Sequence, residues 1–294
     1  MSPLSIFLLI LSIVLAGGRT TLSKSISGIP FGERGFFVLQ ATIFGTGAVV
    51  LFAVNPTAFS GLLPISLLYG ALYATLSVTS QWCYTVALRG GEASVCGTVY
   101  SMGFVIPTLA GMFFWQEEVS VPKIIGIALV IPTLIISGMK GKSSPHEQKR
   151  SGSIGYIIPL SAAMLAAGTL GILQKHLPTS ASGSQISAVI IISFVFSFLT
   201  SLMGAVISKP MPKKSPKKSL LSAAGVGICF ASCNFFNTLL AGMLDSTVLF
   251  PTLNIGIILF TLALGLIFFG EKFGWRQLAI ILLGAASILL ITFA

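Results

Sequence analysis

The stretch SAVIIISFVFSFLTSLMGAVIS, residues 187–208, contains no charged side chain and few strongly polar ones. A helix rises 1.5 Å per residue, so about 20 apolar residues cross the hydrocarbon core of a bilayer. This stretch therefore predicts a transmembrane helix. Runs of similar length and composition recur from the first residues of the chain to the last.

Ten such runs define the predicted fold. Only 8% of the 294 residues are charged and 54% are hydrophobic, with a mean hydropathy of +0.98, whereas soluble domains carry roughly 25% charged residues. We therefore expect an all-α membrane protein with ten transmembrane helices. The predicted spans are residues 4–22, 35–54, 62–88, 94–115, 124–139, 154–173, 187–208, 220–244, 247–269 and 278–293.

The first run resembles a signal peptide, because small residues follow an apolar segment. No Lys or Arg precedes it, as the start of a signal peptide would require. We therefore expect it to be a retained helix.

The chain repeats itself weakly. A shift of 150 residues places Leu15, Ala16 and Gly18 on Leu165, Ala166 and Gly168, and a shift of 154 places Phe114 on Phe268 and Glu117 on Glu271. We therefore predict two five-helix repeats, residues 1–139 and 154–294, joined by a linker of residues 140–153. Because five is odd, the second repeat is inverted in the membrane, an arrangement that creates a binding site between repeats and allows alternating access.

The basic residues are distributed unevenly between the two sides of the predicted bundle. Fourteen of the seventeen Lys and Arg residues follow odd-numbered helices, only Lys123 and Lys175 lie on the other side, and Arg19 lies inside the first span. Basic loops stay in the cytoplasm. We therefore expect the linker and the lysine-rich loop 209–218 to be cytoplasmic, both termini to be outside, and the protein to lie in a bacterial cell membrane.

Short motifs close the fourth and ninth predicted helices: Phe113, Phe114, Trp115, Gln116 and Glu117 in one, and Phe268, Phe269, Gly270 and Glu271 in the other. With the duplicated five-helix unit, they resemble the drug/metabolite transporter superfamily, in its EamA-type branch. The resemblance covers nearly the whole chain and implies a central cavity through which small metabolites cross. Glu117 and Glu271, at helix ends, are interpreted as structural. Gln116 departs from the Gly of the second copy, and residues 55–61 lack the basic residues common between the second and third helices of that family.

The charge most informative about function is Arg19, inside an apolar span. A charge within the membrane is costly, so it marks a functional site, and a guanidinium binds a carboxylate or phosphate through two parallel hydrogen bonds. The alternative is that Arg19, near the end of its helix, extends to the membrane interface. We predict that Arg19 contacts an anionic or zwitterionic substrate such as an amino acid or organic acid.

Polar and aromatic residues of the helices that line the cavity in the resembled family complete the predicted site. Side-chain amides in lipid require a partner, which is either a neighbouring helix or a wet cavity. An aromatic wall with a few amides suits a small polar metabolite. The predicted substrate-binding residues are Arg19, Gln81, Trp82, Tyr100, Asn234, Asn237 and Asn254.

Other functions have less support. All seven acidic residues lie in connections or at helix ends, which disfavours a proton-coupled exporter of drugs and organic cations. The two histidines, His146 and His176, form no catalytic group or zinc motif, so we expect no enzyme, catalytic residue, metal or cofactor. A structural or signalling membrane protein remains an alternative, and so does a lipid-handling protein. The expected partners are a small solute and the bilayer, not nucleic acid, for a monomer or homodimer.

Overall fold

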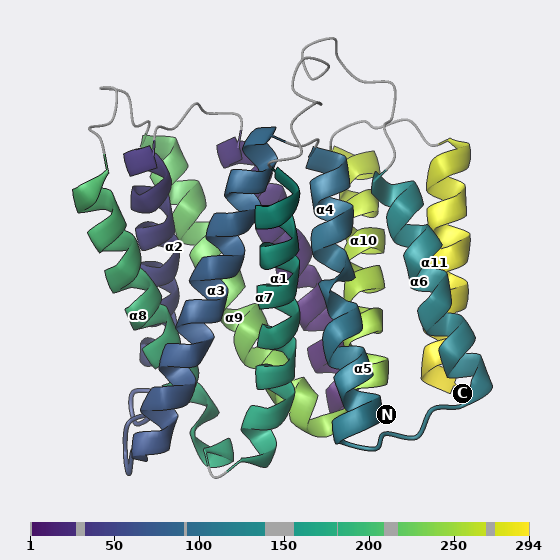
Figure 1. Ribbon diagram of the computed structural model, residues 1–294, viewed down its shortest axis with the longest axis horizontal. Helices are drawn as coiled ribbons and strands as arrows, with labels where there is room; N and C mark the ends of the chain where they lie inside the picture. The colour runs from purple at the N-terminus through teal and green to yellow at the C-terminus, as the bar shows by residue number, and fades with distance from the viewer. Residues whose placement is uncertain are drawn as a thin grey trace. The chain divides into compact units, whose positions relative to one another are not determined.

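The computed structural model describes residues 2–27, 33–90, 93–138, 156–180, 182–208, 217–268 and 274–293. Regular structure in these ranges is helical throughout (Figure 1). The helices are α1 (Pro3–Ser27), α2 (Glu33–Val54), α3 (Pro64–Gly90), α4 (Ala93–Ser101), α5 (Val105–Phe114), α6 (Val121–Gly138), α7 (Ile157–His176), α8 (Ile186–Ile207), α9 (Lys217–Met243), α10 (Ser246–Phe268) and α11 (Trp275–Phe293).

The rod that contains α4 and α5 is continuous, because the 3₁₀ turn Met102–Phe104 joins the two helices. Pro107 explains the turn, since proline has no N–H to donate to the carbonyl four residues earlier. Counted as one rod, α4 and α5 bring the helices of the described ranges to the ten that the sequence predicted. Pro251, in contrast, lies inside α10, which continues through it.

Six helices are long and apolar enough to cross a membrane: Pro3–Ser23, Glu33–Val54, Ile157–Thr179, Gly183–Ile207, Ser219–Met243 and Ser246–Leu264. Three shorter apolar helices are Val99–Phe114, Val121–Ile136 and Gln277–Phe293. α3 is not among these, since Tyr, Ser, Thr and Gln interrupt its apolar residues.

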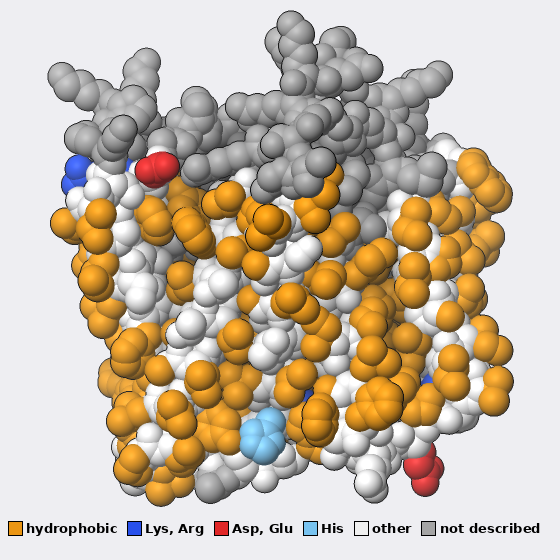
Figure 2. All heavy atoms as spheres, in the orientation of Figure 1, with side chains coloured by type: hydrophobic (Ala, Val, Ile, Leu, Met, Phe, Trp, Pro, Cys, Tyr) orange, Lys and Arg blue, Asp and Glu red, His pale blue; other side chains and the backbone are white. Residues whose placement is uncertain are grey.

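Large apolar side chains on these helices point outward. Ile207 is 82% exposed, and Phe113 and Ile158 are each 77% exposed. On the face shown in Figure 2, apolar atoms cover the helices from end to end, and the acidic side chains lie at the helix ends. Soluble monomers rarely expose apolar patches of this extent, so the helices face lipid.

The chain forms two compact units. Unit 1 contains residues 1–75 and 176–243, and unit 2 contains residues 76–175 and 244–294. Each unit takes helices from both halves of the sequence, and α3 contributes its first part to unit 1 and its second part to unit 2. The two units are defined by contacts in space, whereas the predicted repeats 1–139 and 154–294 are defined by similarity in sequence. The units therefore do not test the repeat boundaries, which stay a prediction.

In unit 1, α2 packs against both α8 and α9, and α1 packs against α9. Leu39 of α2 packs with Ala223 and Val226 of α9, and Gly47 further along α2 lies against Ala231, so these two helices run parallel. Three aromatic rings fill the centre of the unit: Phe44 of α2, Phe194 of α8 and Phe230 of α9 have centroids 5.4–6.0 Å apart.

In unit 2, α5 packs against α10 and α6 packs against α11. The rod of α4 and α5 also approaches α7 closely at Gly168. A Cβ atom there would lie 2.7 Å from Cβ of Ile106 and 2.8 Å from the carbonyl oxygen of Gly103. Only glycine fits this contact without displacing the backbone of the neighbouring rod.

We expect Gly168→Leu to lower the free energy of unfolding by about 1–3 kcal/mol, the usual cost of overpacking a close contact. Thermal unfolding of the detergent-solubilised protein measures the effect. The matched control is Thr169→Leu, because Thr169 is exposed on the same turn of α7 and its hydroxyl donates only to Leu165 of its own helix. Equal melting temperatures for the two variants would contradict the close packing at Gly168.

Candidate functional site

Arg19 of α1 lies inside unit 1. Its guanidinium carbon is 3.9 Å from the centroid of the Phe230 ring on α9. This cation–π contact contributes about 0.5–2 kcal/mol, depending on how far it is desolvated. Because Phe230 belongs to α9, the contact shows that the side chain of Arg19 is directed towards a neighbouring helix. The Phe230 ring is itself buried, at 7% exposure.

The depth of this contact bears on the alternative that Arg19 extends to the membrane interface. α9 has 27 residues, Lys217–Met243, and Phe230 is its middle residue. The guanidinium therefore lies at the depth of the centre of a helix long and apolar enough to cross the membrane. This geometry supports the site interpretation.

Within the described residues, no carboxylate lies within ion-pair distance of Arg19, and no hydrogen-bond acceptor is aligned with its N–H groups. Arg19 is partly buried, and an aromatic face compensates only part of the cost of removing a cation from water. The guanidinium therefore keeps donors that an anion can use.

Polar contacts of Ser12 join α1 to α9 on the same face of α1 as Arg19. The Ser12 hydroxyl donates to Oδ1 of Asn237 and lies 3.4 Å from Sγ of Cys233, while Nδ2 of Asn237 lies 3.6 Å from the same sulfur. α1 and α9 run antiparallel here, since Gly18 lies beside Cys229. The Asn237 carbonyl oxygen thus has a helix-to-helix partner.

Asn234 makes the equivalent connection from α9 to α3. The Tyr73 hydroxyl donates to Oδ1 of Asn234 at 2.6 Å, and Nδ2 of Asn234 donates to the Phe230 carbonyl oxygen at 2.8 Å. Asn234 is 5% exposed and Tyr73 is 1% exposed. Both amides therefore join helices in this structure, which was the alternative to a substrate contact.

The remaining predicted residues belong to unit 2. The Tyr100 hydroxyl lies 3.0 Å from the Ser80 hydroxyl. The ring centroids of Tyr100 and Tyr84 lie 4.6 Å apart. Nδ2 of Asn254 donates to the Phe250 carbonyl within α10. Trp82 is 52% exposed, and Gln81 is partly buried.

The structure thus brings Arg19, Asn234 and Asn237 together on α1 and α9 of unit 1. It places Gln81, Trp82, Tyr100 and Asn254 in unit 2, where Tyr100 forms a cluster with Ser80 and Tyr84. The substrate role of all seven residues stays a prediction.

Glu117 lies at the centre of a second polar cluster, in unit 2. Its Oε1 and Oε2 accept hydrogen bonds from the backbone N–H groups of Ser246 and Thr247 at 2.7 and 2.9 Å, and Lys175 Nζ lies 3.1 Å from Oε1. The carboxylate therefore caps the N-terminus of α10, where the helix dipole favours negative charge. This geometry supports the structural interpretation of Glu117, whereas Glu271 lies outside the described residues.

Opposing effects act on the pKa of Glu117. Burial raises this pKa. The hydrogen bonds from two backbone N–H groups and the Lys175 ammonium together lower it by more than burial raises it, so the pKa lies below its ordinary value of 4.5. The carboxylate stays charged at neutral pH although its side chain is only 4% exposed. Lys175 also donates to the Leu244 carbonyl oxygen at 2.8 Å, so α5, α7 and α10 are joined at this end.

Sequence reasoning did not identify the partners of the two charged groups. Lys175 was assigned only to a connection, although Glu117 and Lys175 both follow even-numbered helices and so were predicted on one side of the membrane. Phe230 gave no comparable signal, because it is one of 22 phenylalanines. Among the residues that the structure describes, no group of three or more His, Cys, Asp or Glu could hold a metal ion.

Comparisons with known proteins place the chain among membrane proteins. It is 33% identical over 103 residues to the uncharacterized membrane protein YvaE of Bacillus subtilis (strain 168), a match that covers 34% of this chain and 79% of YvaE. A solved crystal structure, 14% identical, covers the whole chain and 98% of its own length with a TM-score of 0.74, which shows a shared fold. No family model matches the chain. The protein is therefore an integral membrane protein that belongs to the same family as YvaE.

Proposed function

We propose that the protein is a transporter of the drug/metabolite superfamily, of the EamA type. It moves a small anionic or zwitterionic metabolite by alternating access. The observation that carries this proposal is Arg19, a cation at the depth of the middle of α9 with no carboxylate beside it in the described residues. A permanently charged side chain is retained at such a depth at a cost of several kcal/mol, and binding an anionic substrate gives it a function.

Helix pairing supports the inverted repeat that this mechanism needs. Under the predicted repeats, α2 corresponds to α8, α5 to α10 and α6 to α11, and each of these helices packs against its counterpart. α2 and α8 run antiparallel, since Gly45 lies beside Phe198 and Asn55 bonds Ser187. Antiparallel pairing of counterparts is expected when two halves are related by a twofold axis in the membrane plane.

The size of YvaE is a second argument. The matched 103 residues make up 79% of YvaE, so YvaE has about 130 residues, less than half of this chain. One predicted repeat of the present protein is therefore about as long as the whole of YvaE. Such a size relation is expected when a five-helix unit has been duplicated and fused.

An exporter of organic cations is the second candidate of the same fold. It needs an acidic residue among its helices to bind the cation. The acids of the described residues are Glu33 at the first position of α2, Glu117 and Glu118 between α5 and α6, and Asp245 between α9 and α10. None lies in the middle of a helix, so the anionic or zwitterionic substrate is favoured.

The test is a screen of the purified protein for thermal stabilisation by amino acids, organic acids, sugar phosphates, nucleosides and organic cations, followed by uptake of each stabilising solute into proteoliposomes. A specific solute stabilises by RT ln(1 + [L]/Kd), about 2.7 kcal/mol at 100 times Kd. We expect stabilisation and uptake for an anion or zwitterion. Stabilisation by cations alone would reverse the substrate class, and binding without uptake would favour a non-transporting membrane protein.

A further inference from the structure

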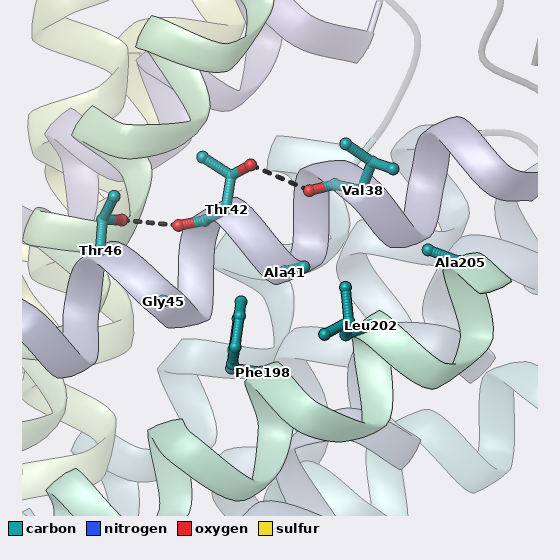
Figure 3. A pocket seen from close by; sticks show the side chains of 8 residues that line it. All are labelled: Val38, Ala41, Thr42, Gly45, Thr46, Phe198, Leu202 and Ala205. Carbon is teal, nitrogen blue, oxygen red and sulfur yellow. Dashed lines mark hydrogen bonds between the residues drawn. The ribbon is translucent and has the colours of Figure 1, made fainter.

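An apolar groove runs between α2 and α8 in unit 1. Its volume is about 270 Å³, and its walls include Val38, Ala41 and Gly45 of α2 and Phe198, Leu202 and Ala205 of α8 (Figure 3). Along α2 it extends from Val38 to Thr46, about 12 Å at 1.5 Å per residue. The groove thus extends along both helices for about two helical turns.

The hydroxyl groups of the two polar residues in the groove already donate hydrogen bonds within α2, so they do not need a hydrogen-bond partner on a bound molecule. The Thr42 hydroxyl donates to the Val38 carbonyl at 2.9 Å, and the Thr46 hydroxyl donates to the Thr42 carbonyl at 2.8 Å, both within α2 (Figure 3). The adjacent surface is apolar and exposed, with Leu202 46% and Val206 71% accessible. In a membrane, hydrocarbon is the occupant that fits such walls.

One end of the groove carries positive charge. Arg34 lies one turn before Val38, on the same face of α2 as Val38, Ala41 and Gly45, because residues at i, i+4, i+7 and i+11 share a face. Within the described residues, Arg34 has no ion pair or hydrogen bond through its side chain. An arginine at this position is free to bind a phosphate bidentately.

The packing of the helices adds basic residues at the same end. Since α8 is antiparallel to α2, it ends at Ile207 near the start of α2. Since α9 is parallel to α2, it begins there, at Lys217 and Lys218. Glu33 carries a negative charge at this end, so these four residues have a net positive charge, on the side that the charge count predicts to be cytoplasmic.

We propose that this groove binds an anionic phospholipid. One acyl chain lies between α2 and α8, and the lipid phosphate is bound by Arg34 at the membrane surface. Anionic lipids are attracted by basic residues at the cytoplasmic ends of membrane helices. The groove selects for the shape of the acyl chain, and Arg34 selects for the negative charge of the lipid headgroup.

The experiment is native mass spectrometry of the full-length protein in detergent, titrated with phosphatidylglycerol or phosphatidylcholine with identical acyl chains. We expect phosphatidylglycerol to bind about tenfold more tightly, which corresponds to about 1.4 kcal/mol. Arg34→Gln should remove this preference, and Arg34→Lys should retain part of it. Leu202→Trp should weaken binding of both lipids, because the larger side chain fills the groove.

Met203→Trp is the matched control, since Met203 is 63% exposed on α8 and does not line the groove. It should leave the binding of both lipids unchanged. If Leu202→Trp does not fold, Leu202→Phe replaces it as a smaller step. Unchanged lipid preference in Arg34→Gln, or unchanged lipid binding in a folded Leu202 variant, would overturn the proposal.

Discussion

Glu117→Gln should lower the free energy of unfolding by about 3–5 kcal/mol, the cost of removing one partner of a buried ion pair. The variant loses the charge opposite Lys175. It also loses a hydrogen bond, because the amide NH₂ of glutamine would face one of the N–H groups of Ser246 and Thr247 that the carboxylate now accepts. Chemical or thermal unfolding in detergent measures the loss.

Two variants separate this effect from a general change of surface charge. Glu118→Gln neutralises the adjacent, exposed carboxylate and should have almost no effect. In the double variant Glu117→Gln/Lys175→Met no charge is left unpaired, so it should recover part of the stability. A double variant as unstable as the sum of the single variants would show that the ion pair contributes nothing.

The pH dependence of unfolding gives an independent control. The folded pKa of Glu117 lies below its ordinary value of 4.5, so its contribution is fully present above that value and is lost as the pH falls through the folded pKa. The wild-type protein should therefore lose stability more steeply than Glu117→Gln below pH 4.5. Parallel stability curves for the two proteins would contradict the lowered pKa.

The helices were predictable from sequence because the thickness of the bilayer sets the length of the apolar run that crosses it. The predicted and observed ends of α2 and α8 differ by at most two residues. The 3₁₀ turn before Pro107 also has a local cause, the missing N–H of proline, whereas α10 continues through Pro251. The composition of the two compact units was not predicted. Apolar residues occur on every face of these helices, so the sequence does not specify which face contacts lipid and which packs against a helix that is distant in sequence.

The candidate site was predictable only in part, and for the same reason. Arg19 is conspicuous in sequence because charge is rare in an apolar span. Its position over Phe230, in contrast, depends on the antiparallel register of α1 and α9, which no local pattern specifies. The amides of Asn234 and Asn237 were recognised as polar groups in need of partners, but their partners Tyr73 and Ser12 lie on other helices, far away in sequence.

Arg19→Gln should weaken binding of an anionic or zwitterionic substrate by about 10- to 150-fold, because hydrogen bonds to a charged group contribute about 1.5–3 kcal/mol. Arg19→Lys should bind with intermediate affinity, since it keeps the charge and loses the bidentate geometry. Isothermal titration of the solute identified by the stabilisation screen, together with uptake into proteoliposomes, measures both variants.

The fold of the Arg19 variants should survive, since the side chain loses only a cation–π contact worth about 0.5–2 kcal/mol and no ion pair of the described residues. Thr20→Val is the matched control, because its exposed hydroxyl donates only to Ala16 of the same helix. It should leave binding and uptake unchanged. If Arg19→Gln binds and transports the solute as the wild type does, Arg19 has no role in substrate binding. The guanidinium would then be retained for its packing on Phe230.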